Sequence, residues 1–152
     1  MRAHDLAEDY PTVSTGDEAM TAARLMAEER LPALLVLDPR GVPAAILPAS
    51  QLVKTLVPPY VIEDPALAAV IDERHADRLC AALAGRTVGD LLTGSAGPPP
   101  IAAPDDTALE VAALMARTRS PLVAVLDRDK AGPRLLGVIT ASHLLHRLLG
   151  AA

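Results

Sequence analysis

The sequence predicts a mixed α/β (α+β) fold built from two β-α-β-β-α repeats, with an extra helix between the repeats. TVSTGDEAMTAARLMAEERLPALLVLD (12–38) aligns without a gap with IAAPDDTALEVAALMARTRSPLVAVLD (101–127), and eleven of the 27 positions are identical. AILPASQLV (45–53) then aligns with GVITASHLL (137–145), after a hairpin that is three residues longer in the second copy. A helix, a strand, a turn and a second helix recur in one order, which indicates an internal duplication.

Each copy begins with an extended segment and a helix. Asp17 and Asp106 are expected at the two helix starts, where a carboxylate suits the free N–H groups and the helix dipole. Apolar residues recur at spacings of three and four, which predicts helices that pack on a core: Ala19, Met20, Ala23 and Met26, and Ala108, Leu109, Ala112 and Met115. We interpret the methionines as core residues, not as part of a cofactor site.

Two strands and a terminal helix follow in each copy. The apolar runs 33–37 and 122–126 are too short for helices and are predicted strands. DPRG (38–41) is a turn sequence, and DRDKAGPR (127–134) predicts a longer hairpin. Second strands are expected at 44–47 and 135–139, each followed by an amphipathic helix. Neither half could bury both faces of its elements alone, so the two halves are expected to pack together.

Residues 58–86 separate repeat 1 (1–57) from repeat 2 (87–149). After a proline turn, this segment predicts a helix from Pro65 to Leu83, with Gly85 as its stop. The predicted apolar face consists of Leu67, Val70, Ile71, Leu79 and Leu83. We interpret this helix as a packing or dimer-contact element.

Composition and motifs exclude several function classes. The net charge of −5 and the absence of Trp and Phe argue against a nucleic-acid partner. No apolar run approaches the roughly 18–20 residues that span a bilayer, so no membrane insertion is expected. The acidic N-terminal segment is unlike a secretory signal, which predicts a cytoplasmic location.

The same reasoning argues against a metal site and against catalysis. His75, Asp77 and Cys80 have no fourth ligand nearby and match no zinc spacing, so no metal site is expected. The other histidines, His4, His143 and His146, accompany no glycine-elbow nucleophile and no HExxH pattern, and GSAGPPP (94–100) lacks the Lys-Ser/Thr of a phosphate loop. We therefore expect no catalytic residues and no enzyme activity.

Three features together resemble a pair of CBS domains, the Bateman module. They are an alanine-rich helix ending in LMxxxR, an apolar strand ending in Asp, and the Gly-Val-Ile-Thr turn at 137–140. The resemblance covers residues 1–57 and 87–149 and implies a pseudo-twofold axis with two clefts between the repeats. Such modules commonly bind AMP, ATP or S-adenosylmethionine, dimerise, and regulate an enzyme, channel or transporter. The resemblance therefore implies a homodimer with a separately encoded enzyme or transporter as partner.

The ribose grip of this family reads Gly-apolar-x-Thr/Ser-x-x-Asp, with the threonine opening a helix and the aspartate in its first turn. The second copy keeps Gly137 and Thr140 but has His143 in place of the aspartate. The first copy departs at all three positions, with Ala45, Pro48 and Gln51. The helix dipole disfavours an imidazolium at 143, and a neutral ring accepts only one hydrogen bond. The alternative, a surface histidine at a helix start, stays open.

The resemblance also places the grip of one repeat against the leading segment and first core strand of the other. The better cleft then combines Thr140 and His143 with Val13, Leu31 and Ala33. The poorer cleft combines Pro48 and Gln51 with Ala102, Ser120 and Leu122. We expect any ligand binding in the better cleft and none in the poorer one.

Phosphate binding is also expected to be weak. Many members carry a basic residue at the positions held here by Ala33 and Leu122. Arg30 and Arg119, three residues earlier, could hold an anion, or could simply complement the dipole at a helix end.

Two functions remain. The first is a sensor of an adenosine compound through one degenerate cleft. The second is a ligand-free dimerisation and interaction scaffold with decayed nucleotide sites.

Overall fold

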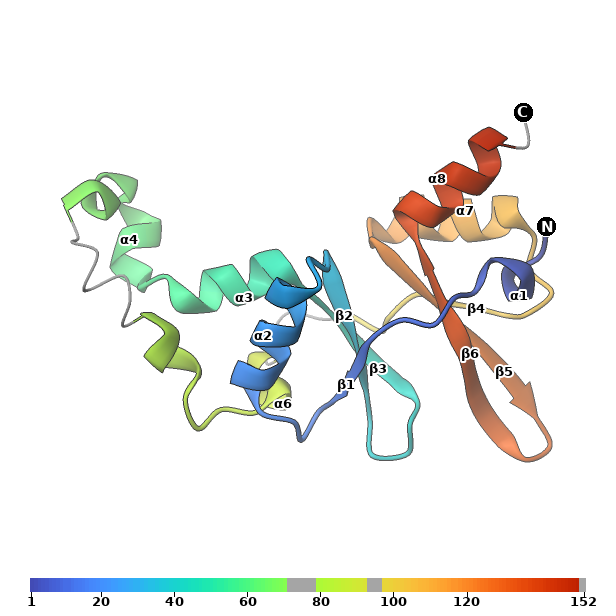
Figure 1. Cartoon of the computed structure of the whole chain (residues 1–152), viewed down its shortest axis with the longest axis horizontal. Helices are drawn as coiled ribbons and strands as arrows, with labels where there is room; N and C mark the ends of the chain where they lie inside the picture. Colours follow the sequence, from blue (N-terminus) through green and yellow to red (C-terminus); the bar gives the residue numbers. More distant parts are fainter. Residues whose placement is uncertain (71–78, 93–96, 151–152) are drawn as a thin grey trace.

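A computed structural model describes residues 1–70, 79–92 and 97–150 and confirms the duplicated fold (Figure 1). The first repeat contains β1 (Thr12–Ser14), α2 (Ala19–Glu28), β2 (Ala33–Leu37), β3 (Pro43–Pro48) and α3 (Ala49–Leu56). The second contains β4 (Ile101–Ala102), α7 (Ala108–Thr118), β5 (Leu122–Asp129), β6 (Gly132–Thr140) and α8 (Ala141–Gly150). In each sheet the leading strand runs parallel to the central strand, which is antiparallel to the last strand, in the orders β1-β2-β3 and β4-β5-β6.

Alternate residues of the two central strands face opposite cores. Leu34 and Val36 of β2 pack in the core of the first repeat, and Val123 and Val125 of β5 pack in the core of the second. The intervening positions form a third apolar cluster, where the two repeats meet: Ala33, Leu35, Leu122, Ala124 and Val138. The sheets therefore pack on each other, as the near-continuous apolar runs indicate.

The short helices that open the two repeats are exchanged between the two cores. α1 (Ala3–Leu6) opens the chain, yet Leu6 is buried in the core of the second repeat. α6 (Val88–Leu91) opens the second repeat, yet Leu91 is buried in the core of the first. Residues 7–11, which we call the strap, lead from α1 across to β1 (Figure 1). Each repeat is thus completed by a helix that is adjacent in sequence to the other.

The inter-repeat segment differs from the single predicted helix. It contains α4 (Pro59–Glu63) and the 3₁₀ helices η1 (Pro65–Val70) and η2 (Leu79–Leu83). Residues 71–78, which include His75 and Asp77, and the side chain of Cys80 lie outside the described part. Leu83 is buried against the first repeat, whereas Val70 is exposed, so the predicted apolar face is not a continuous contact. Gly85 has φ +73°, which suits its predicted role as a stop.

The two helix starts also differ from the expectation. Asp17 and Asp106 precede the helices and accept the backbone N–H of Ser14 at 2.8 Å and of Ala103 at 2.9 Å. Each carboxylate therefore closes the turn after a leading strand. Of the helices that the structure describes, none is long and apolar enough to cross a bilayer.

Candidate ligand clefts between the repeats

Thr140 is the cap of α8. The strand β6 ends at Thr140 and the helix begins at Ala141. The Thr140 hydroxyl accepts the backbone N–H of His143 at 3.1 Å and lies 3.3 Å from the Ser142 hydroxyl. The threonine thus satisfies a free N–H group at the helix start, as an N-cap residue does.

His143 faces a carboxylate from the strap. Its Nδ1 lies 3.4 Å from Oε1 of Glu8, and only 19% of the His143 side chain is exposed. The strap is fixed at this point, because the backbone N–H of Glu8 donates to the carbonyl of Val138 at 3.0 Å and the N–H of Val138 donates back at 2.9 Å. The position that holds an aspartate in the family motif therefore holds a histidine paired with a carboxylate from elsewhere in the chain. Sequence reasoning missed Glu8, since no local pattern links it to His143.

Three predicted cleft residues lie in or against the first repeat. Val13 is buried in its core, and Leu31 packs partly buried against the same core. Ala33 is buried in the cluster between the repeats, and its carbonyl accepts the Tyr10 hydroxyl at 2.7 Å. Burial raises the pKa of Tyr10, although the hydrogen bond to Ala33 acts in the opposite direction. A shared ligand site formed by these residues with Thr140 stays a prediction.

A cavity of about 380 Å³ lies in the cleft beside Pro48. Both repeats line it: Ile46, Pro48, Gly97, Pro98, Pro99, Pro100, Thr118, Arg119, Ser120 and Pro121. The Ser120 hydroxyl is engaged, because it donates to the Leu122 carbonyl at 2.7 Å. No carboxylate of the described residues forms an ion pair with Arg119. Apolar walls with one guanidinium suit a small anionic ligand with an apolar body.

Arg30 and Arg119 occupy equivalent places in the two repeats. Both are exposed and have left-handed backbones, with φ of 53° and 52°. Arg30 follows the end of α2, and Arg119 is the C-cap of α7. Of the two, Arg119 lines the cavity beside Pro48.

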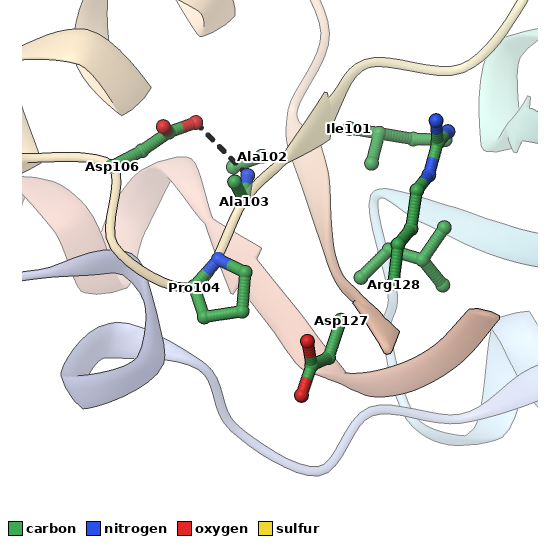
Figure 2. A pocket seen from close by; sticks show the side chains of 8 residues that line it. Ile101, Ala102, Ala103, Pro104, Asp106, Asp127 and Arg128 are labelled. Atoms are coloured by element: carbon green, nitrogen blue, oxygen red, sulfur yellow. Dashed lines mark hydrogen bonds between the residues drawn. The ribbon is translucent and has the colours of Figure 1, made fainter. Parts of the chain in front are cut away.

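A second cavity, of about 460 Å³, lies at the carboxyl ends of β4 and of the apolar part of β5 (Figure 2). Asp106 turns toward the Ala103 N–H, and the Arg128 side chain extends away from Asp127 (Figure 2). Asp127 pairs with Arg134 at 3.7 Å. Because its carboxylates are engaged, this cavity favours no ligand class. Among the described residues, no group of three His, Cys, Asp or Glu side chains could hold a metal ion.

An apolar groove of about 470 Å³ lies between the two helices of the second repeat. We call it the α7–α8 groove, and it is lined by Ala112, Met115, Ala116, Arg119, Ser120, Pro121, Ala141, Leu144, Leu145 and Leu148. In the first repeat, η2 packs against the corresponding helices α2 and α3.

Comparisons with known proteins identify the family. The CBS domain model matches residues 88–150. A CBS domain-containing protein of unknown function from Kribbella flavida, known from its crystal structure, shares 47% sequence identity with this chain. The match covers 98% of this chain and 99% of that chain, with a TM-score of 0.85.

More distant solved structures share the fold. One is CBSX2 in complex with AMP, at 18% identity and a TM-score of 0.67, covering 99% of this chain and 97% of that chain; CBSX2 is from Arabidopsis thaliana. Another is the CBS domain of a bacterial CNNM/CorC family Mg²⁺ transporter in complex with ATP, at 14% identity and a TM-score of 0.67, covering 99% of this chain and 88% of that chain. No curated protein matches the sequence. The duplicated fold and these matches show that the chain belongs to the CBS-domain proteins, as a tandem CBS pair.

Proposed function

We propose that the protein is a non-catalytic regulatory CBS pair that acts in trans on a separately encoded enzyme or transporter. It retains one weakened site for an adenosine compound at the Thr140 turn. The observation that carries this proposal is the pairing of His143 with Glu8, at the place where the family motif has an aspartate. The AMP complex of CBSX2 and the ATP complex of the transporter CBS domain support adenosine compounds as the ligand class.

The weakening follows from the hydrogen bonds that the turn can offer. A carboxylate that binds two ribose hydroxyls makes charge-assisted bonds worth about 1.5–3 kcal/mol each, whereas a single ring nitrogen makes one bond of about 1 kcal/mol. The difference corresponds to roughly a ten- to hundredfold loss of affinity or more. Glu8 adds to this loss, because a ligand hydroxyl that approaches Nδ1 of His143 must compete with its carboxylate.

Calorimetry with AMP, ATP and S-adenosylmethionine tests the site. The native chain should bind weakly, and His143→Asp combined with Glu8→Gln should bind ten- to a hundredfold more tightly. The second substitution removes the repulsion between two adjacent carboxylates. Adding Thr140→Ala to this pair should abolish the gain. The matched control is Gln51→Asp, which places a carboxylate at the equivalent position of the first repeat, where Pro48 supplies no hydroxyl. It should gain nothing if the ligand occupies the Thr140 turn, and a gain would point to the cavity beside Pro48. Tight binding by the native chain would contradict a weakened site.

The cavity beside Pro48 is a second candidate site for an adenosine compound. Its guanidinium, Arg119, would contact a phosphate. If native binding is lost in Arg119→Gln and kept in Thr140→Ala, this cavity is the site. If none of the variants binds any of the three compounds, the protein is a ligand-free interaction scaffold.

Self-association is part of both functions, and we propose a homodimer. The exposed leucines along α8 support it, since Leu145, Leu148 and Leu149 all reach solvent in the single chain.

A further inference from the structure

Residues 58–70 form an arm that carries exposed apolar side chains. The arm consists of α4 and η1, which contact each other, and it lies at the opposite end of the molecule from α7 and α8 (Figure 1). Tyr60 and Ile62 are each 49% exposed and Val70 is 78% exposed. Large apolar side chains gathered on one projecting element mark an interaction surface.

The internal duplication allows the surface between the two helices of one repeat to be compared with the same surface of the other. In the first repeat, the inter-repeat segment covers α2 and α3, and Leu83 of η2 is buried with Met26 and Leu52 of these helices. In the second repeat, the corresponding surface is the open α7–α8 groove, where Leu145 is 57% exposed. The same surface is thus covered in one repeat and open in the other.

The charges of the arm and of the groove are complementary. The arm contains Glu63 and Asp64, both exposed, and no basic residue. The helices of the groove end near the arginines Arg117, Arg119 and Arg147, and of these Arg119 lines the groove itself. The one acidic residue of these helices, Glu110, lies in the first turn of α7 and bonds to Thr107. The acidic arm is thus complementary in charge to Arg119 of the groove, in a protein whose net charge is −5.

We propose that the arm of each chain docks in the α7–α8 groove of a second copy. Because the arm lies at the opposite end of the molecule, it does not reach the groove of its own chain (Figure 1). Reciprocal docking gives a closed twofold dimer with two identical junctions. In each junction, Tyr60 and Ile62 enter beside Leu145, and Glu63 and Asp64 face Arg119. The inference rests on the proposed homodimer and specifies how it is built.

Sedimentation velocity without ligand tests the junction. Ile62→Glu in the arm and Leu145→Glu in the groove should each weaken dimerisation at least tenfold. The matched control is Val53→Glu in α3, the equivalent of Leu145 in the first repeat; Val53 is 59% exposed and should tolerate the change. A mixture of the two weakened chains should form heterodimers, because one junction remains intact. A native monomer at tens of micromolar would overturn both the junction and the homodimer, whatever the adenosine calorimetry gives.

Charge reversal tests the same junction without adding a charge to an apolar site. Arg119→Glu alone, and Glu63→Arg with Asp64→Arg, should each weaken the dimer, and the three changes in one chain should restore it. Circular dichroism confirms that each variant is folded.

Photo-crosslinking gives a positive readout of the contact, because it does not rely on a loss of dimerisation. With benzoylphenylalanine at Tyr60, mixed isotope-labelled and unlabelled chains should crosslink between copies to residues 141–150. If crosslinks map to another surface, or if Leu145→Glu weakens the dimer while Ile62→Glu does not, the copies associate in another way and the arm does not dock.

Discussion

The backbone of the strap passes so close to Gly137 that no side chain fits between them. A Cβ atom at this position would lie 2.8 Å from the carbonyl oxygen of Glu8 and 3.1 Å from the Cβ of Ala7. The strap cannot retreat easily, because Glu8 and Val138 exchange two backbone hydrogen bonds. Gly137 therefore has a steric role that is independent of any ligand.

We expect Gly137→Ala to reduce the free energy of unfolding by about 1–3 kcal/mol, as overpacking against fixed atoms does. Urea denaturation measures the change. The control is Gly16→Ala, where a Cβ meets nothing within 4 Å and φ is not positive; its stability should change by less than about 0.5 kcal/mol. Equal stability of Gly137→Ala and the native chain would mean that the strap is not held at this point.

At the residue scale, the sequence predicts the roles that depend on neighbouring residues in the chain. Thr140 is recognisable because a threonine between a strand and a helix is a common cap. The role of Glu8 is not recognisable from the sequence, because its partner His143 lies at the other end of the chain. Each residue taken alone resembles an ordinary surface side chain. The pairing depends on the path of the strap, which no local pattern specifies.

At the scale of the element, α7 has a stronger start than α2. The Thr107 hydroxyl accepts the backbone N–H of Glu110 at 3.2 Å, and the Glu110 carboxylate accepts the Thr107 N–H at 2.6 Å. Glu18, the N-cap of α2, makes no such side-chain bond. The repeats are equivalent in fold, yet only α7 of these two helices has a capping box.

The capping box predicts a pH dependence. The hydrogen bond from the Thr107 N–H holds the pKa of Glu110 below its usual value of 4.5. Its contribution to stability is therefore present above pH 4.5 and is lost as the pH falls through the lower pKa of the folded state. An NMR titration should find the Glu110 pKa below 4.5 in the native chain. In Thr107→Ala it should be higher yet still below 4.5, because this change removes the side-chain hydrogen bond and keeps the backbone N–H. The stability difference between the native chain and Glu110→Gln should shrink toward acid pH. A Glu110 pKa at or above 4.5 would contradict the box.

The sequence predicts the strands better than the inter-repeat segment. The runs 33–37 and 122–126 are strands in the structure because a short apolar run between turns fits few other elements. The helix expected from Pro65 to Leu83 rests on apolar spacing alone, which two 3₁₀ helices at its ends also satisfy. The sequence places Pro59 in a turn, whereas in the structure it starts α4, where its fixed φ and missing N–H are suitable.

At the scale of the whole molecule, the exchanged helices make the two repeats interdependent. Leu6 completes the second core and Leu91 completes the first. In the sequence, Asp5-Leu6 and Asp90-Leu91 occupy the same place ahead of the two aligned segments, which indicates that they are equivalent. It does not show which sheet each one covers, because either arrangement buries the same leucine.

We expect Leu6→Ala and Leu91→Ala each to cost about 2–5 kcal/mol, the usual range for a buried leucine. Each should lower the stability of both repeats in one transition, because each leucine links the chain segment of one repeat to the core of the other. Methyl NMR signals from both cores during denaturation measure this. Leu109→Ala, at an exposed position of α7, is the control. Independent melting of the two repeats would contradict the coupling.

The exchange also constrains the order in which the chain can fold while it is being synthesised. The core of the first repeat cannot close until Leu91 has left the ribosome, so this repeat waits for the whole inter-repeat segment. Leu6, made almost at once, stays uncovered until α7 and β6 exist. Contacts between such distant parts of a chain form slowly, and the apolar segments that await them are exposed meanwhile. The first half can therefore close only after residue 91 has emerged, and the second only after β6 has followed.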